Sequence, residues 1–161
     1  MSARAEALAQ RIEEGARNLA SLAEGLTESE WNTVVKPDGR RVGVVIHHVA
    51  SVYPIEVHLA SEIAAGKTVT GVTWAVVADM NAKHAEENAS CSKAETIELL
   101  RRASMEAAAA VRGLSDAQLD SAAPFSLNAD APLTSQFVIE DHALRHSWHH
   151  LAKIKAALGR G

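Results

Sequence analysis

The chain has 161 residues, of which 47% are hydrophobic but only 4% aromatic. This length and composition predict one globular domain over residues 1–161, built from helices that pack closely through alanine. The formal net charge of −4 gives no overall attraction to nucleic acid or to anionic membranes, so neither is expected as a partner.

The single cysteine, Cys91, excludes an internal disulfide, and the charged N-terminus lacks the apolar core of a signal peptide. We therefore expect a cytoplasmic protein, and because no window approaches about 18 consecutive apolar residues, no transmembrane helix.

Apolar residues recur at spacings of three and four from the N-terminus onward, which predicts an amphipathic helix over residues 2–24 that ends at Gly25. Thr27–Glu30 has the form of a capping box, so Trp31 is expected on a short helical turn. Lys36-Pro37-Asp38-Gly39 is a typical turn sequence.

The remaining helices are predicted from the same spacing over residues 42–65, 73–88, 93–112 and 133–158. Residues 121–132 carry no β-hairpin signal and are expected to form a plain connection. Four long helices and a shorter crossover helix over 73–88 predict an all-α fold, a four-helix bundle with long connections.

Four of the eight histidines lie close together in the last predicted helix, at positions 142, 146, 149 and 150. With His146 as the origin and about 100° per residue, the apolar face of this helix is centred near 110°. His150 lies at about 40°, while His142 and His149 lie outside, at about −40° and −60°. The inward pair is therefore His146 and His150, one turn apart.

His48 lies in the middle of the apolar stripe of the second long helix. A lone buried histidine is usually a core residue with a satisfied hydrogen bond, and a pair spaced i,i+4 is by itself a weak signal. Three unpaired imidazoles in one core are costly, however, unless something binds them. Three neutral histidines also leave a coordination position open, which is typical of a reactive metal site.

The segment Val42-Gly43-Val44-Val45-Ile46-His47-His48-Val49-Ala50, followed by His146-x-x-x-His150-Leu151-Ala152-Lys153-Ile154, resembles the DinB/YfiT-like superfamily. The resemblance implies an up-down-down-up bundle, a homodimer and a divalent metal on three histidines, which align with His48, His146 and His150. Leu151-Ala152-Lys153 departs from the Arg-Gly-Gln that is frequent in the family, and this departure puts the pocket rim or the dimer surface in doubt.

Three further residues are candidates for the pocket. Asn81 and His84 share one side of the crossover helix, and His149 borders the ligand pair. A plain polar helix face explains the first two equally well. We expect His47 and His142 at the surface or rim. Helical phase argues against a role at the metal for Tyr53 and Asp141. Isolated tryptophans more often pack in a core than line a pocket, so core packing is expected for Trp31, Trp74 and Trp148.

A metal on three imidazoles lowers the pKa of a bound water or thiol. The resemblance implies metal-dependent hydrolysis of a small molecule, or transfer or isomerisation with a bound low-molecular-weight thiol. Zinc, nickel, iron and manganese all suit imidazole ligands. The alternative is a dimeric, non-catalytic binding or stress-response protein with a structural or vestigial metal. No general acid or base is evident in the sequence, and the sequence therefore leaves open whether the protein is an enzyme. A deep pocket above the metal would favour the enzyme, whereas a sealed metal would favour the structural role.

Overall fold

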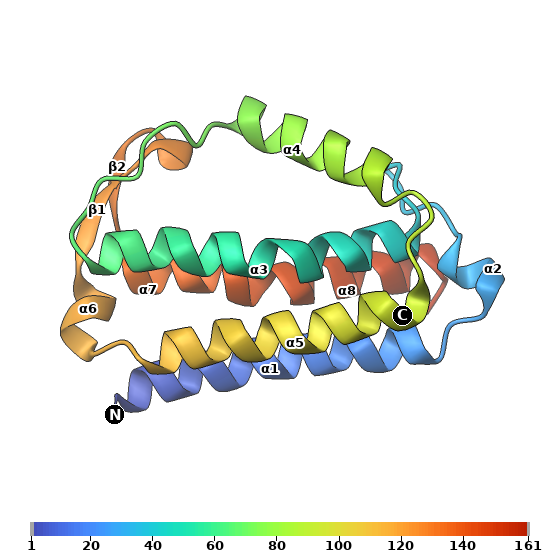
Figure 1. Cartoon of the computed structure of the whole chain (residues 1–161), viewed down its shortest axis with the longest axis horizontal. Helices are drawn as coiled ribbons and strands as arrows, with labels where there is room; N and C mark the ends of the chain where they lie inside the picture. Colours follow the sequence, from blue (N-terminus) through green and yellow to red (C-terminus); the bar gives the residue numbers. More distant parts are fainter. Residues whose placement is uncertain (1, 161) are drawn as a thin grey trace.

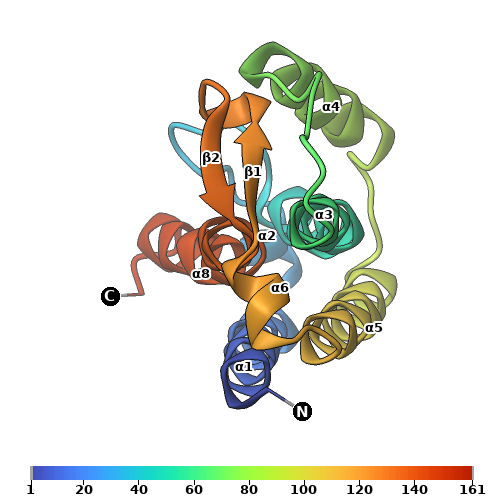
Figure 2. The same cartoon turned by 90° about the vertical axis from the view of Figure 1, so that its left-hand side faces the viewer.

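The computed structural model describes residues 2–160, and four long helices form its core (Figure 1). They are α1 (Ala3–Glu24), α3 (Val42–Ala64), α5 (Lys93–Arg112) and α8 (Arg145–Ala157). Helices α1 and α5 lie side by side below α3 and α8, and the end-on view shows the same square of helices (Figure 2). Because α1 and α8 run one way while α3 and α5 run the other, the bundle has the up-down-down-up topology.

The predicted bounds of α1, α3 and α5 lie within about two residues of the observed ones, and side chains cap the N-termini of α1 and α5. The Ser2 hydroxyl accepts a hydrogen bond from the Ala5 amide and so caps α1. Thr27 and Glu30 form the predicted capping box of the short helix α2 (Glu28–Trp31). Ser92 caps α5 by accepting from the Glu95 amide.

Small side chains let the helices of the lower layer approach closely. The buried alanines of α1 and α5 are Ala5, Ala9, Ala16, Ala20, Ala23, Ala103, Ala107 and Ala108. Gly15 brings α1 equally close to the last helix, because a Cβ at this position would lie 2.3 Å from Ser147 Oγ. The larger apolar residues fill the space between the layers, with Leu8, Ile12, Ile46, Leu100 and Ile154 among the most buried.

Helix α3 is the one described helix long and apolar enough to cross a membrane by length and composition. More than half of its most apolar window, 56%, is buried inside the bundle. His48 and Glu56 also lie in its buried face. This is the position of a core helix, with the polar site of the molecule on its inner side.

Helix α4 (Trp74–Glu87) connects the parallel helices α3 and α5 by running back along the outside of the bundle (Figure 1). It contains no buried residue, and only a few of its side chains, such as Val77 and His84, contact the bundle. Its predicted position and length agree with the structure to within one residue at each end.

Residues 121–132 form more than the plain connection that the sequence predicted. After the short helix α6 (Asp116–Asp120), strands β1 (Ala122–Phe125) and β2 (Ala131–Thr134) pair antiparallel. Between the strands lie a 3₁₀ turn over Ser126–Asn128 and two residues with positive φ, Ala129 (58°) and Asp130 (57°). The prediction was wrong because this turn contains no glycine and none of the usual hairpin dipeptides.

The last helix is not the uninterrupted α-helix predicted over residues 133–158. It begins with α7 (Ser135–Val138), continues as a π-helical segment over Ile139–Leu144, and becomes regular only in α8. A π-helical turn bonds i to i+5 and so contains more residues than an α-helical turn. Helical phase counted back from α8 is therefore wrong before Arg145.

Candidate metal centre

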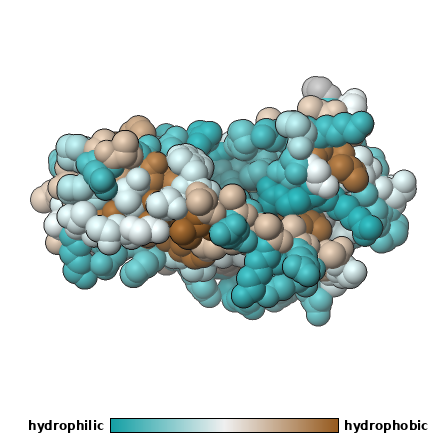
Figure 3. Space-filling model, turned by 90° about the horizontal axis from the view of Figure 1, so that it is seen from above, coloured by the Kyte–Doolittle hydropathy of each residue, from teal (hydrophilic) through white to brown (hydrophobic). Residues whose placement is uncertain are grey.

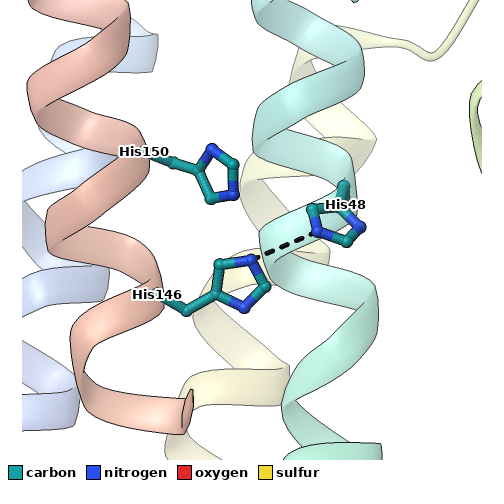
Figure 4. Close-up of side chains that lie close together, drawn as sticks. All are labelled: His48, His146 and His150. Carbon is teal, nitrogen blue, oxygen red and sulfur yellow. Dashed lines mark hydrogen bonds between the residues drawn. The ribbon is translucent and has the colours of Figure 1, made fainter. Parts of the chain in front are cut away.

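Three histidines from two neighbouring helices converge inside the upper layer of the bundle (Figure 4). His48 comes from α3 and is only 5% exposed, while His146 and His150 come from successive turns of α8. The Nε2 atoms of His48 and His146 are 3.2 Å apart. One ring nitrogen from each of the three residues lies within 4.8 Å of the others. The structure thus brings together the three residues that the sequence predicted as ligands.

These three nitrogens could hold one metal ion, and the spacing of one pair suits tetrahedral coordination. Metal–nitrogen bonds of about 2.0–2.1 Å at tetrahedral angles place ligand nitrogens about 3.3 Å apart, close to the spacing of His48 and His146. Burial, assisted by His146 and Arg40, lowers the pKa of His48 to about 2. The same influences, burial first, lower the pKa of His150 to about 3. Both imidazoles are therefore neutral at physiological pH, as metal ligands must be.

Glu56 orients one of the three ligands. Its Oε1 accepts a hydrogen bond from His146 Nδ1 at 2.6 Å, which leaves the His146 Nε2 lone pair to face His48. The side chain of Glu56 is 11% exposed, and its Oε2 finds no hydrogen-bond partner within residues 2–160. Sequence reasoning missed this residue. Its signal was a carboxylate among the apolar residues of α3, eight positions after His48.

A cleft of about 410 Å³ opens onto the three histidines. Two of the predicted pocket residues, Asn81 of α4 and His149 of α8, line it. His149 is exposed and its ring centroid lies 5.2 Å from that of His150, whereas Asn81 faces the cleft from the opposite wall. The metal centre therefore lies at the base of an open cleft and is not sealed by side chains.

The third pocket candidate, His84, belongs to a separate pair next to the cleft. Its Nε2 lies 2.8 Å from Nδ1 of His47 on α3, so one of the two nitrogens donates a hydrogen bond to the other. Ser51 Oγ is within 3.4 Å of both rings. Burial lowers the pKa of His47 and is the largest cause that lowers the pKa of His84. His47 is thus half-buried and bonded, not a free surface group.

The π-helical segment places two further polar residues against the cleft. Asp141 and His142 both line it, although helical phase had excluded the first and put the second at the rim. His142 packs edge-on against Phe125 of β1, and burial lowers the pKa of its imidazole. Asp141 pairs with Arg145 at 3.1 Å. The extra residue of the π-helical turn explains both differences.

The three tryptophans divide between core and surface. Trp31 is buried, with its ring against Gly43, whereas Trp74 is 68% exposed and lines the cleft. Trp148 is partly exposed on α8. Core packing, the role expected of isolated tryptophans, thus holds for Trp31 alone.

Comparison with known proteins identifies the family of the chain. A family model described as the DinB superfamily matches residues 11–154, nearly the whole chain. The chain belongs to the DinB superfamily. The resemblance found in the His48 segment and the His146–His150 pair is thereby confirmed. A search among curated proteins finds no match.

The fold of this DinB-superfamily chain is also found in a solved structure. YfiT from Bacillus subtilis superposes with a TM-score of 0.77 over 99% of this chain and 89% of its own, at 20% sequence identity. YfiT is described as a probable metal-dependent hydrolase with an unusual four-helix bundle topology. At this identity the likeness establishes the shared bundle and nothing about activity.

Proposed function

We propose that this DinB-superfamily protein binds one divalent metal ion on His48, His146 and His150 and uses it to hydrolyse a small molecule. The observation that carries the proposal is the cleft of about 410 Å³ that opens onto the three imidazoles. A volume of this size is typical of small-molecule sites. A purely structural metal would need no such opening, so the non-catalytic alternative is less well supported.

The chain's own groups suit hydrolysis. A divalent ion on three neutral imidazoles supplies a Lewis acid that lowers the pKa of water or of a thiol. Glu56 holds the His146 ring through Oε1, and its second oxygen is free to accept a proton from the attacking water. The carboxylate that the sequence did not reveal thus fills the role of the missing base. The description of YfiT as a probable metal-dependent hydrolase supports the same reaction class.

Thiol-dependent transfer or isomerisation is the second candidate reaction. Cys91, the single cysteine, lies in a different pocket with Trp31 and Gly43, and burial raises the pKa of its thiol. Any reactive sulfur would therefore come from a bound low-molecular-weight thiol. Because nothing in the cleft is specific for a thiol, while Glu56 suits water, we place hydrolysis first.

Metal analysis joined to activity screening tests the proposal. Protein purified without a histidine tag or chelator is expected to contain about one divalent ion per chain, drawn from zinc, nickel, iron and manganese. It should hydrolyse members of an ester and amide panel in a metal-dependent manner. His48→Ala should lose both metal and activity, whereas His58→Ala, on the exposed side of α3, should keep both.

The outcomes separate the alternatives. Turnover only in the presence of glutathione, cysteine or another small thiol would favour the transferase. Stoichiometric metal without any turnover would favour the structural role, and metal-free protein with full activity would overturn the proposal. The homodimer and the cytoplasmic location stay predictions, and light scattering would test the first.

A further inference from the structure

The cleft above the metal centre is walled by apolar side chains that face each other across open space. Helix α3 contributes Val52, Ile55 and Leu59, and helix α4 contributes Trp74, Val76, Val77 and Met80. Three of the four α4 residues are conspicuously exposed, with Trp74 at 68%, Met80 at 45% and Val76 at 42%. Seen from the side of α4, hydrophobic surface is visible among hydrophilic side chains (Figure 3).

Exposed apolar walls of this kind favour a bound apolar group. When a ligand covers apolar side chains that were exposed to water, the binding free energy becomes more favourable by about 25 cal/mol for each Å² of apolar surface that is buried. Helix α4 has no buried residue of its own. Val77 packs partly against the core, while Trp74, Val76 and Met80 are left largely exposed. A ligand body between α3 and α4 would cover both walls together.

Arg40 gives the same cleft a positive group near the metal centre. Its side chain is only 16% exposed, and Nε and Nη2 each bind Asp38 at 2.6 Å. Nη1 is buried and has no hydrogen-bond partner among residues 2–160. Arg40 lines the cleft together with His48 and His150, and its charge contributes to lowering the pKa of both imidazoles.

A buried, unpaired guanidinium N–H is costly unless a ligand accepts from it. Of the other charged groups of the cleft, Asp141 pairs with Arg145, and Glu56 bonds His146 through Oε1 while its Oε2 offers no donor. The free donor of Arg40 therefore matches an acidic oxygen, and the planar guanidinium is especially suited to carboxylate.

We propose that the metal centre acts on apolar carboxylates: molecules with an acyl or aryl body that lies between α3 and α4 and a carboxylate that Arg40 binds beside the reacting group. This inference names the substrate class of the proposed hydrolase and rests on that function. N-acylated amino acids are the simplest compounds of this class, because an acyl chain, a hydrolysable amide and a carboxylate follow one another within a few atoms.

Matched ligands test the two parts of the inference separately. Calorimetric titration of the metal-loaded protein, repeated after chelation, compares N-octanoylglycine with N-acetylglycine and with N-octanoylglycinamide. The longer chain should bind on the order of a hundredfold more tightly than acetyl, because six additional methylene groups are largely buried. The carboxylate should bind about tenfold more tightly than the neutral amide, since only the carboxylate brings a negative charge to its hydrogen bond with the Arg40 guanidinium.

Matched variants place the effects on the residues named. Met80→Ala should reduce the chain-length preference several-fold, whereas Met105→Ala, exposed on α5, should not change it. Arg40→Gln should abolish the preference for the acid over the amide, whereas its neighbour Arg41→Gln should retain it. The two ligand pairs on the unaltered protein keep the test valid even if Arg40→Gln fails to fold.

Equal affinity for the octanoyl and acetyl compounds, or for the acid and the amide, would overturn the inference. If only the proposed function is wrong, the result is different. No compound is then hydrolysed in a metal-dependent manner, but the protein still prefers octanoyl over acetyl and the acid over the amide. Preferences that survive chelation therefore support the substrate class independently of turnover.

Discussion

Glu56 combines two tasks in a single carboxylate. One oxygen fixes the tautomer and ring orientation of His146, and the other lies buried and unpaired beside the cleft. Partners of metal-bound histidines of this kind commonly contribute 10–100-fold to metal affinity. The side chain therefore matters both for holding the metal and for the chemistry that follows.

We predict that Glu56→Ala weakens metal binding by about tenfold or more, because the His146 ring loses its acceptor. Competition with a chromophoric chelator measures the dissociation constant. Glu56→Gln should retain most of the affinity, since the amide oxygen still accepts from Nδ1, but should lose most of the hydrolytic rate. Glu62→Gln, on the same helix and paired with Lys67, is the control. Unchanged affinity in Glu56→Ala would refute the orienting role.

Burial of His48 makes the metal-free protein sensitive to acid. Folding lowers the pKa of this imidazole from an ordinary value near 6.5 to about 2, with burial as the main cause and His146 and Arg40 as lesser ones. As the pH falls below about 6.5, the unfolded chain binds the proton and the folded chain does not. The stability contributed by the neutral imidazole is thus present above that pH and is lost below it.

Denaturant unfolding of chelator-treated protein checks this prediction. Between about pH 7.5 and about pH 5.5, the free energy of unfolding should fall by about 1.4 kcal/mol more in the unaltered protein than in His48→Asn. His150, whose pKa is about 3, contributes a similar drop that both proteins share. An identical pH dependence in the two proteins would contradict the buried neutral state of His48.

The site residues could be predicted from the sequence where the helical phase alone decides in which direction the side chain points. His48, His146 and His150 lie in regular parts of α3 and α8, so a period of 3.6 residues identified them. Glu56 lies about 80° around α3 from His48 by the same count. That angle is beyond the apolar stripe, and only the position of α8 turns it into an interior residue.

At the scale of elements, few contacts hold α4 to the bundle, and one of them is the packing of Val77 against the core. Helix α4 buries no side chain, and the hydrogen bond between His84 and His47 joins it to α3. Segments with few buried contacts open at low free-energy cost. The wall of the cleft that α4 provides is therefore its most easily displaced part.

We predict that His84→Ala speeds amide hydrogen exchange across Trp74–Glu87 by roughly fivefold, because one hydrogen bond of about 1 kcal/mol is lost. Exchange measured by mass spectrometry on peptides from α4 and α3 distinguishes a local effect from global unfolding. His58→Ala should leave both peptides unchanged. If α4 keeps its protection in His84→Ala, its attachment lies elsewhere.

Elements were predictable where capping residues and apolar spacing agree, as in α1 and α5, and in α3, which has no side-chain cap, from apolar spacing alone. The hairpin was missed because Ala129 and Asp130 adopt positive φ without the glycine that usually signals it. The π-helical segment was missed because its sequence, Ile139–Leu144, contains nothing that distinguishes it from an α-helix. Both depend on tertiary packing, which no local pattern encodes.

For the whole molecule, a metal at this site would join α3 to α8, two helices almost a hundred residues apart in sequence. Zinc at about a hundred times its dissociation constant should raise the free energy of unfolding by about 2.7 kcal/mol, since the unfolded chain offers no assembled site. Denaturant titrations with and without chelator measure this gain. His150→Ala should show little of it, and a full gain in that variant would place the metal elsewhere.

The π-helical segment before α8 has a consequence for sequence length within the superfamily. Such a segment amounts to one residue more than a regular helix needs between the hairpin and the His146–His150 pair. Relatives with an unbroken last helix are therefore expected to be one residue shorter at this point. If an alignment places this one-residue gap at another point of the chain, the relatives' residues are matched to Asp141 and His142 with an error of one position. The two histidine ligands, which follow the segment, stay correctly aligned.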